Sequence, residues 1–340
     1  MVTLKDIAQE AGVSVMTVSN VVNGNLSKVS DKTAQQIQEI ITRLNYIPNR
    51  SARNLVKNNS QLISIILRGE QGQNPLQNPH NALLIGTIIQ LTQKHGYYAM
   101  INVMKDASDI CQSIRSWNAE GAILIGMFDN EIEDICTVSD IPMVFIDSYT
   151  NIRQLSNVGI DDYKGGCLAA QCLIKHGHKS LAFIGPKASY SGVIQQRFSG
   201  FCNELEKCGL TFNPSYYFTL KSDVDFEEIS ALGAQLAKYR NKITGAFVTS
   251  DQIVSYLVNI LKQNGMDIPR DLSIVGFDDL EICRQLTPQI TTIAQDIPQK
   301  AKIAVEILFR RLKSSNTPAE SIVLDVSLIE RNSVYDIMQI

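Results

Sequence analysis

The chain has 340 residues, 44% of them hydrophobic and 19% charged, which is the composition of a globular protein with two or three compact units. No apolar run approaches the roughly 18 residues of a membrane span, and polar side chains stand where a signal peptide would have its apolar core. We therefore expect a cytoplasmic protein without membrane contact. Seven cysteines without a C-x-x-C pair indicate neither a disulfide framework nor a zinc site, so we expect reduced core residues, and no metal or cofactor.

The net charge of −3 is unevenly divided along the chain. Residues 1–60 contain seven lysines and arginines against four aspartates and glutamates, which is +3, so the remaining 280 residues carry −6. A basic head on an acidic body suggests that only the head meets a polyanion, although an excess of three charges is small enough to arise by chance.

The head begins with two short helices separated by a glycine. Thr3 is placed to cap a helix over LKDIAQEA, whose apolar residues recur at the i, i+3, i+4, i+7 spacing of one buried face. Gly12 suits the tight turn that follows. Ser14 is placed to cap a second helix that starts at Val15.

The second helix has two different faces. Val18, Val21 and Val22 fall at i, i+3 and i+4 and form one stripe toward the core. The opposite face carries Val15, Met16, Ser19, Asn20 and Asn23. A third helix, SDKTAQQIQEIITRLNY, supplies isoleucines to the same core. This is the helix-turn-helix arrangement, whose second helix enters the major groove of DNA, although a three-helix bundle used only for packing has the same pattern.

Residues 45–61 join the head to the body. Pro48 ends one element and begins another, and the centre of the segment, RSARNLV, is compatible with about two turns of helix, which is too short to be stable alone in water. A short basic segment of this kind is a candidate for folding on DNA.

The body alternates short apolar runs with amphipathic helices. The runs occur at 62–67, 99–103, 121–126, 143–146, 181–185, 245–249 and 272–277. This alternation predicts β-α-β units with parallel sheets, and more than 200 residues of it indicates two lobes. A dehydrogenase would have a similar pattern, but no G-x-G-x-x-G follows any of these runs.

Several phrases are specific enough to identify a family. They are TLKDIAQEAGVSVMTVSNVVNG, VSDKT and NYIPNRSARNL in the head, and VGIDDYKGGCLAA, HGHKSLAFIG, QQRFSGF, MDIPRDLSIVGFDDL and TPQITTIAQD in the body. Together they resemble the LacI family of bacterial transcriptional regulators over nearly the whole chain. The resemblance implies a small all-α helix-turn-helix DNA-binding domain (1–47), a hinge helix with linker (48–60), and an effector-binding and dimerisation domain (61–340). This last domain is an α/β two-lobed fold like that of periplasmic binding proteins, with two parallel, doubly wound sheets. Its lobes are expected at 62–160 with 291–321, and at 161–290 with 322–340.

The resemblance also implies which residues meet DNA. In the family the hinge helix forms when a dimer docks on its operator, and a leucine, matched here by Leu55, wedges into the minor groove. The predicted DNA contacts are Thr3, Ser14, Val15, Met16, Thr17, Ser19, Asn20, Asn23, Ser30, Thr33, Asn49, Arg50, Ala52 and Leu55.

Base recognition is expected from the second helix. Val15, Met16 and Asn20 are placed to meet base edges, while Thr17, Ser19 and Asn23 suit phosphates. Many family members have an arginine, which suits guanine, at the position of Asn20. Asparagine pairs with adenine, and Val15 and Met16 suit thymine methyl groups, so our hypothesis is a half-site richer in A and T than is usual for the family.

The effector site implied by the resemblance lies between the lobes, at the carboxyl ends of the strands. Its predicted residues are His80, Asn81, Asp147, Asp162, Arg197, Asp251 and Asp278. Arg197 matches an arginine whose planar guanidinium group donates hydrogen bonds to ligand oxygens. Without the resemblance, we would expect a solvated arginine on an amphipathic helix. Asp251 and Asp278 follow apolar runs, where a carboxylate either accepts from ligand hydroxyl groups or caps a helix.

This site departs from the family pattern. His80 and Asn81 follow an Asn-Pro pair where phenylalanines are usual, and Asp162 replaces a common asparagine. Asp147 is followed by serine in place of a cleft arginine. We therefore expect a neutral sugar or related polyhydroxylated effector, with a purine-type corepressor as the alternative.

The implied function is allosteric regulation of transcription, in which a homodimer binds double-stranded operator DNA and effector affinity is coupled reciprocally to DNA affinity. A repressor is expected, and the sign of the coupling is open. A cytosolic small-molecule binding protein is a second possibility, but it leaves the head unexplained. The four histidines show no spacing typical of a metal cluster or catalytic pair, so we expect no enzyme.

Overall fold

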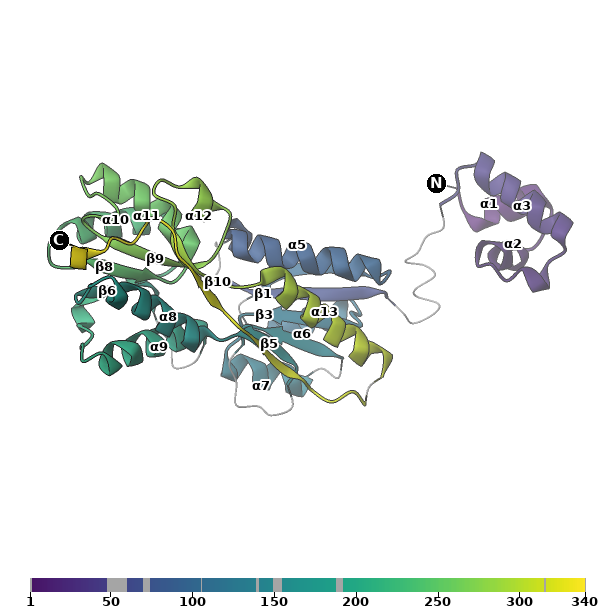
Figure 1. Ribbon diagram of the computed structural model, residues 1–340. Helices are drawn as coiled ribbons and strands as arrows, with labels where there is room; N and C mark the ends of the chain where they lie inside the picture. Colours follow the sequence, from purple (N-terminus) through teal and green to yellow (C-terminus); the bar gives the residue numbers. More distant parts are fainter. Residues whose placement is uncertain are drawn as a thin grey trace. The chain divides into compact units, whose positions relative to one another are not determined.

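The computed structural model describes residues 2–47, 60–69, 74–104, 106–138, 141–148, 155–187, 192–314 and 316–339. The chain forms two compact units, Met1–Ser60 and Gln61–Ile340 (Figure 1). The predicted hinge helix, with its expected DNA contacts Asn49, Arg50, Ala52 and Leu55, lies outside the described residues.

The first unit contains the three predicted helices. They are α1 (Leu4–Ala11), α2 (Val15–Val22) and α3 (Asp31–Arg43), with a short 3-10 turn at Leu26–Lys28. Thr3 and Ser14 cap α1 and α2 as predicted, and Gly12 ends α1 with a φ of +66°. Val18 and Val21 are buried against Ile7 and Ile37, while Val22 is half-buried at the edge of the same core. The valine stripe is therefore core, as expected.

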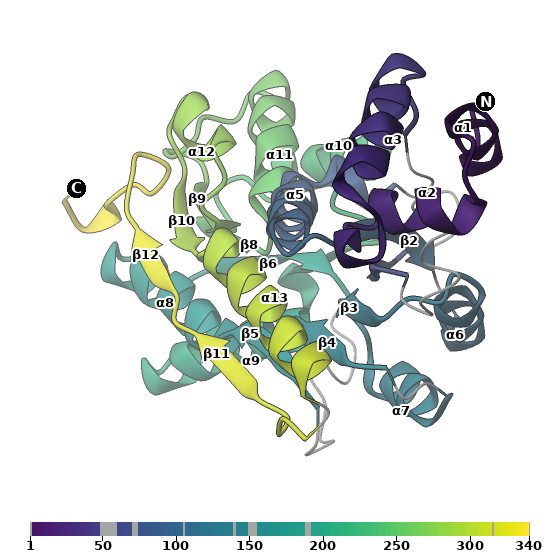
Figure 2. The same cartoon turned by 90° about the vertical axis from the view of Figure 1, so that its right-hand side faces the viewer.

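The first lobe of the second unit is built on a parallel six-stranded sheet with the order β11-β5-β4-β3-β1-β2. Its strands are β1 (Leu62–Arg68), β2 (Tyr98–Met104), β3 (Gly121–Ile125), β4 (Met143–Ile146), β5 (Asn157–Ile160) and β11 (Ser321–Leu324). Helices α5 (Pro79–Lys94) and α13 (Ile297–Lys313) lie side by side on one face (Figure 2). Helices α6 (Ala107–Ser116) and α7 (Asp129–Val138) cover the other face.

The second lobe repeats this design with the strand order β12-β10-β9-β8-β6-β7. Its strands are β6 (Leu181–Pro186), β7 (Tyr217–Leu220), β8 (Gly245–Val248), β9 (Ser273–Asp278), β10 (Thr291–Ala294) and β12 (Ser327–Ile329), and β12 is antiparallel to β10. Helices α8 (Asp162–Lys175) and α9 (Val193–Lys207) cover one face. Helices α10 (Phe226–Ala237) and α11 (Asp251–Gln263) cover the other, followed by the short α12 (Ile282–Gln285). Single 3-10 turns lie at Pro75–Gln77, Pro214–Tyr216 and Ile337–Gln339.

The chain crosses between the lobes three times, but two crossings lie later than predicted. Strand β10 pairs with β9 and so belongs to the second lobe, whereas residues from 291 onward were expected in the first. Strand β11 pairs with β5 along its whole length to Leu324, beyond the expected limit at 321. Each of these strands has only four residues, and strands of that length carry no sequence mark of the sheet that they join.

Burial explains the apolar runs. Every residue of β3, β4, β8 and β9 is buried, because helices cover both faces of each sheet. The cysteines are all free, as expected, but Cys136 and Cys208 are exposed and Cys202 is half-buried, so the expectation of core cysteines is wrong for these three. Among the described residues, no helix is long and apolar enough to span a bilayer.

Candidate functional site

The outward face of α2 carries no charge. The side chains of Val15 and Met16 are 45% and 71% exposed. Asn20 lies one turn further along, is half-buried, and its side-chain amide bonds to no other described residue. These three residues therefore stay available for an outside partner.

The predicted phosphate contacts are engaged in local hydrogen bonds. Ser14 Oγ pairs with Thr17 Oγ1 at 2.9 Å, and Asn23 Nδ2 donates to Ser19 Oγ at 3.2 Å. Other predicted DNA contacts repeat this pattern at the start of the other helices, where Thr3 bonds with Asp6 and Ser30 with Thr33. These residues thus fix the helix ends, and the backbone N–H groups that they do not satisfy remain for phosphates.

Charge is also balanced within the helical head. Residues 2–47 contain four basic and four acidic side chains, so the excess of +3 in the head belongs to residues 48–60. One of the four basic side chains, Arg43, pairs with Glu10. The described part of the head therefore offers shape and apolar contact more than net charge.

The second unit contains a pocket of about 230 Å³ between its lobes, at the carboxyl ends of the strands. The first lobe contributes Asn78, His80, Asn81, Ile125, Gly126 and Asp147, and the second contributes Pro186, Val193, Ile194, Arg197, Asp223, Thr249, Ser250 and Asp278; Gln295 comes from the crossover after β10. Five of the seven predicted effector residues therefore line one pocket. Its volume is below the roughly 300–1,000 Å³ of pockets for drug-sized ligands, which suits a compound as small as a monosaccharide.

Arg197 on α9 is held in place from three sides. Its Nε donates to Asp162 Oδ1 at 2.7 Å, one terminal nitrogen donates to the carbonyl oxygen of Thr249 at 2.7 Å, and its guanidinium lies 3.5 Å from the centre of the Phe277 ring. Burial opposes the charge, but the nearby carboxylates of Asp162 and Asp278 hold the pKa of Arg197 above its ordinary value. The remaining guanidinium N–H groups can donate to a ligand in the pocket.

A close helix crossing sets the position of Arg197. Gly166 on α8 and Gly200 on α9 have no room for a side chain, because a Cβ at either one would lie 2.0 Å from a backbone carbonyl oxygen of the facing helix. The two helices therefore cross in backbone contact, which brings Asp162 at the start of α8 against Arg197.

A chain of hydrogen bonds joins the two lobes beneath the pocket. Asp278 Oδ1 accepts from Gln295 Nε2 at 2.6 Å, and Gln295 Oε1 accepts from Lys300 Nζ at 2.7 Å. Lys300 Nζ also donates to Asp147 Oδ2 at 2.7 Å. Asp147 and Asp278 have φ angles of +53° and +117°, so both pocket carboxylates are carried by strained backbone at the ends of their strands.

His80 and Asn78 enter the pocket from the start of α5. His80 Nδ1 lies 3.2 Å from Asn81 Oδ1, and the amide nitrogen of Asn81 donates to the Pro75 carbonyl oxygen; in the neutral ring Nδ1 therefore carries the proton and Nε2 is an acceptor. Burial, and then the charge of Lys300, lower the pKa of His80, although Asp278 and Asp147 oppose this shift. The side-chain amide of Asn78 donates to Asp223 across the pocket, and burial raises the pKa of Asp223.

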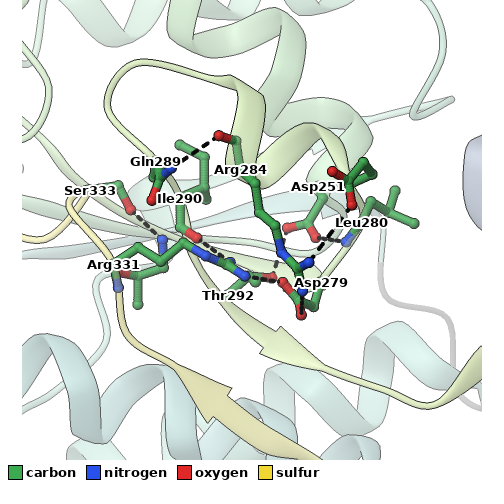
Figure 3. Close-up of polar contacts among 11 residues, drawn as sticks. Asp251, Asp279, Leu280, Arg284, Gln289, Ile290, Thr292, Arg331 and Ser333 are labelled. Carbon is green, nitrogen blue, oxygen red and sulfur yellow. Dashed lines mark hydrogen bonds and ion pairs between the residues drawn. The ribbon is translucent and has the colours of Figure 1, made fainter.

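Two predicted effector contacts need correction. Asp162 does not line the pocket, because its carboxylate is buried behind Arg197 and bonds to it. Asp251 does not line it either: its two oxygens accept from the Leu280 N–H at 3.0 Å and the Thr292 hydroxyl at 2.8 Å (Figure 3). Burial raises the pKa of Asp251. Ser250, not Asp251, caps α11 and lines the pocket.

The loop after β9 is fixed mainly by Arg331. Arg331 donates to Asp279 Oδ1 at 2.5 Å and to the Ile290 carbonyl oxygen at 2.8 Å, and Arg284 approaches the other oxygen of Asp279 at 3.5 Å (Figure 3). Leu280, the next residue, packs into the core of the first lobe. The strand end that carries Asp278 is thus tied to both lobes.

Three buried polar atoms of the lining have no hydrogen-bond partner among the described residues. They are His80 Nε2, Asp147 Oδ1 and Thr249 Oγ1. Buried polar atoms normally find partners, so three of them around one pocket indicate a site for a polar ligand. Two of the three, His80 Nε2 and Asp147 Oδ1, can only accept.

Sequence reasoning missed several residues of this site. Asn78 and Ser250 stand next to predicted residues but carry no signal of their own, and Gln295 lies inside a phrase that indicates only the family. Lys300 and Asp223 have no sequence signal at all, because a lysine on an amphipathic helix and an aspartate in a loop are ordinarily solvated.

Comparisons with known proteins agree with this geometry. Residues 3–49 match the family described as bacterial regulatory proteins, lacI family, and residues 170–334 match a periplasmic binding protein-like domain. The chain is 31% identical over 342 residues to the ribose operon repressor of Haemophilus influenzae, and the alignment covers 99% of this chain and 100% of that protein. The chain belongs to the lacI family.

Solved structures share the fold of this lacI-family chain. A Lac repressor dimer bound to operator and the anti-inducer ONPF has a TM-score of 0.82 at 24% identity, covering 98% of this chain and 99% of that one. A LacI family regulator from Enterococcus faecium with bound ribose has a TM-score of 0.71 at 22% identity, covering 81% and 99%. The protein is a DNA-binding transcriptional regulator with an effector domain of two lobes.

Proposed function

We propose that this regulator is a repressor whose operator affinity is controlled by a small neutral polyhydroxylated compound bound between the lobes. The observation that carries the proposal is the set of unpartnered acceptors in the pocket, His80 Nε2 and Asp147 Oδ1. A hydroxyl group can donate to each of them, whereas the oxygens of a phosphate or carboxylate would meet them as a second acceptor.

The charges around the pocket support the same ligand class. Three carboxylates line it, those of Asp147, Asp223 and Asp278, against the single guanidinium of Arg197. Lys300 and Asp162 lie behind the lining residues, and their opposite charges offset each other. This excess of negative charge disfavours an anionic effector and leaves Arg197 to donate to a neutral ligand oxygen.

D-ribose is the first candidate effector. The ribose operon repressor of Haemophilus influenzae is a full-length relative, and the Enterococcus faecium regulator holds ribose in the same fold. A purine corepressor is the alternative, but its unprotonated ring nitrogens can only accept hydrogen bonds, whereas every hydroxyl group of a sugar can donate to these acceptors.

The test is a thermal-shift panel on the full-length protein with D-ribose, D-glucose, adenine and D-ribose 5-phosphate. A ligand at 100 times its dissociation constant adds about 2.7 kcal/mol of stability to the folded state. We expect a sugar to raise the melting temperature of wild type and of Asp267→Asn, which changes an exposed carboxylate, but not of Asp278→Asn. A shift with adenine or the phosphate ester alone would contradict the proposal.

On DNA we propose that a homodimer occupies a palindromic operator in the cytoplasm, and that α2 recognises a half-site rich in A and T through Val15, Met16 and Asn20. The uncharged face of α2 supports this assignment, since Asn pairs with adenine and apolar side chains contact thymine methyl groups. A gel shift with genomic fragments, repeated at increasing salt, tests it. Binding that ignored sequence at every salt concentration would contradict base recognition by α2. We propose no enzymatic activity.

A further inference from the structure

Lys300 is the one lysine among the described residues that has no exposed surface. It belongs to the second turn of α13 and does not line the effector pocket. Its ammonium group donates to Asp147 Oδ2 and to Gln295 Oε1, and Gln295 in turn donates to Asp278. We call Asp147, Lys300, Gln295 and Asp278 the relay. It connects one pocket carboxylate of each lobe through the crossover after β10.

Packing alone does not account for a lysine at this position. Removing an ammonium group from water is costly, and an apolar side chain of similar volume in place of a buried ion pair often leaves stability unchanged or higher. The residues around Lys300 on α13, such as Ala301, Ala304 and Val305, are apolar and belong to the core of the first lobe. Apolar side chains in place of both Lys300 and Asp147 would suit that core, so the ion pair itself needs an explanation.

The ammonium group sets the direction of each hydrogen bond in the relay. Because it can only donate, Gln295 must turn its oxygen toward Lys300 and its amino group toward Asp278. Asp278 is then held as an acceptor. Asp147 gives Oδ2 to Lys300, which leaves Oδ1 buried, unpartnered and still an acceptor.

We propose that Lys300 is a positioning residue for effector binding, which keeps Asp147 directly, and Asp278 through Gln295, as hydrogen-bond acceptors for the effector's hydroxyl groups. The inference rests on the proposed function, since it assumes a hydroxylated effector in this pocket. It adds that the selectivity for donors originates in a residue that never touches the effector.

Other titratable groups also face the relay. His80 on α5 faces both carboxylates, while Arg197 on α9 and Asp251 on α11 face Asp278. Burial raises the pKa of Asp278, Asp251 adds to this shift, and His80, Arg197 and the bond from Gln295 oppose it. Without Lys300 the amide of Gln295 is free to rotate. Asp278 then takes up a proton more readily and donates where it previously accepted.

The test is the pH profile of D-ribose binding to the full-length protein, measured by calorimetry at pH 6 and pH 8. For wild type we expect binding at most about twofold weaker at pH 6 than at pH 8, because the pKa of Asp278 is raised to about 6 and about half of this carboxyl group is still ionised at pH 6. For Lys300→Met we expect binding roughly tenfold weaker at pH 6 than at pH 8, since one proton taken up changes affinity by up to about tenfold per pH unit. Lys302→Met, which changes an exposed lysine of the same helix, should behave as wild type.

The proposal would be overturned if the ratio of the dissociation constants at pH 6 and pH 8 were the same for wild type and Lys300→Met. It would also be overturned if Lys302→Met changed this ratio as much as Lys300→Met. If Lys300→Met does not fold, Lys300→Gln takes its place, because glutamine keeps an N–H donor without the charge. Its binding should also be weaker at pH 6 than at pH 8, by a smaller factor.

If D-ribose does not bind wild type, the ribose assignment is wrong. Thermal unfolding without sugar then tests the effect of Lys300 on the two carboxylates. The loss of melting temperature caused by Lys300→Met should then be smaller at pH 6 than at pH 8, because the freed carboxylates hold protons in the folded state. Equal losses at the two pH values would refute it.

Discussion

The crossing of α8 and α9 makes a quantitative prediction for Gly166→Ala. The new Cβ would lie 2.0 Å from the Arg197 carbonyl oxygen, and contacts below 3.0 Å are essentially never found for real Cβ atoms. The helices must therefore separate by at least about 1 Å. The bond between Arg197 Nε and Asp162 Oδ1, now 2.7 Å, would lengthen to about 3.7 Å and be lost.

Two costs follow for the free energy of unfolding. Overpacking costs about 1–3 kcal/mol, and loss of a hydrogen bond between charged groups costs about 1.5–3 kcal/mol more. The sum of roughly 2.5–6 kcal/mol should lower the melting temperature of the second unit by roughly 5–24 °C, at about 2–4 °C per kcal/mol. D-ribose affinity should fall as well, because Arg197 leaves its position above Phe277.

Circular dichroism melts of the full-length protein would measure this loss. Gly86→Ala is the matched control, since Gly86 lies inside α5 with nothing within 4 Å of its would-be Cβ. Alanine is the better helix former by about 1 kcal/mol, so this variant should melt at the wild-type temperature or slightly above. If Gly166→Ala melted within 1 °C of wild type, the backbone contact between α8 and α9 would be refuted, and with it the reason given for the position of Arg197.

Three further predictions concern the head and the pH dependence of stability. Asn20→Arg should change the base selected at one half-site position from adenine to guanine in a selection from random duplexes, and an invariant guanine already chosen by wild type would contradict the assignment. Val18→Ala should cost the head about 2 kcal/mol, seen as faster hydrogen exchange in α1–α3, because Val18 is fully buried, whereas the exposed Val15→Ala should change exchange little. Burial lowers the pKa of His178, so the unfolded chain binds more protons and stability should fall as the pH drops below the ordinary value of 6.5. The slope is at most about 1.4 kcal/mol per pH unit, and His178→Gln should flatten it; an unchanged slope in urea titrations would show that His178 is not the titrating group.

The sequence predicted best those parts of the fold that local rules determine. The caps Thr3 and Ser14, the valine stripe of α2 and the seven apolar strands all follow from spacing and burial over a few residues. Strands β5, β7, β10, β11 and β12 have three or four residues and alternate or mix polar with apolar side chains, so periodicity says little about them. Their sheet membership depends on pairing with residues as much as 164 positions away, as between Leu324 and Ile160.

The pocket was predicted in outline and missed in its inner layer. Arg197 and Asp278 follow phrases that mark strand and helix ends, where a ligand is expected. Asp162 and Asp251 occupy similar positions, but their carboxylates turn to protein donors, a choice that depends on neighbours brought in by the fold. Lys300 could not be recognised because its burial results from the packing of α13 against the sheet.

The late position of α13 and β11 in the chain has a consequence for biosynthesis. The first lobe has five of its strands by Ile160, yet its last strand ends at Leu324, and α13, which covers one face of the sheet, also comes late. A ribosome adding about 5–20 residues per second needs roughly 8–30 s for the intervening 164 residues. During that interval the apolar face under α13 is open while the second lobe is being made. The nascent first lobe should therefore be the main client of chaperones in the synthesis of this regulator.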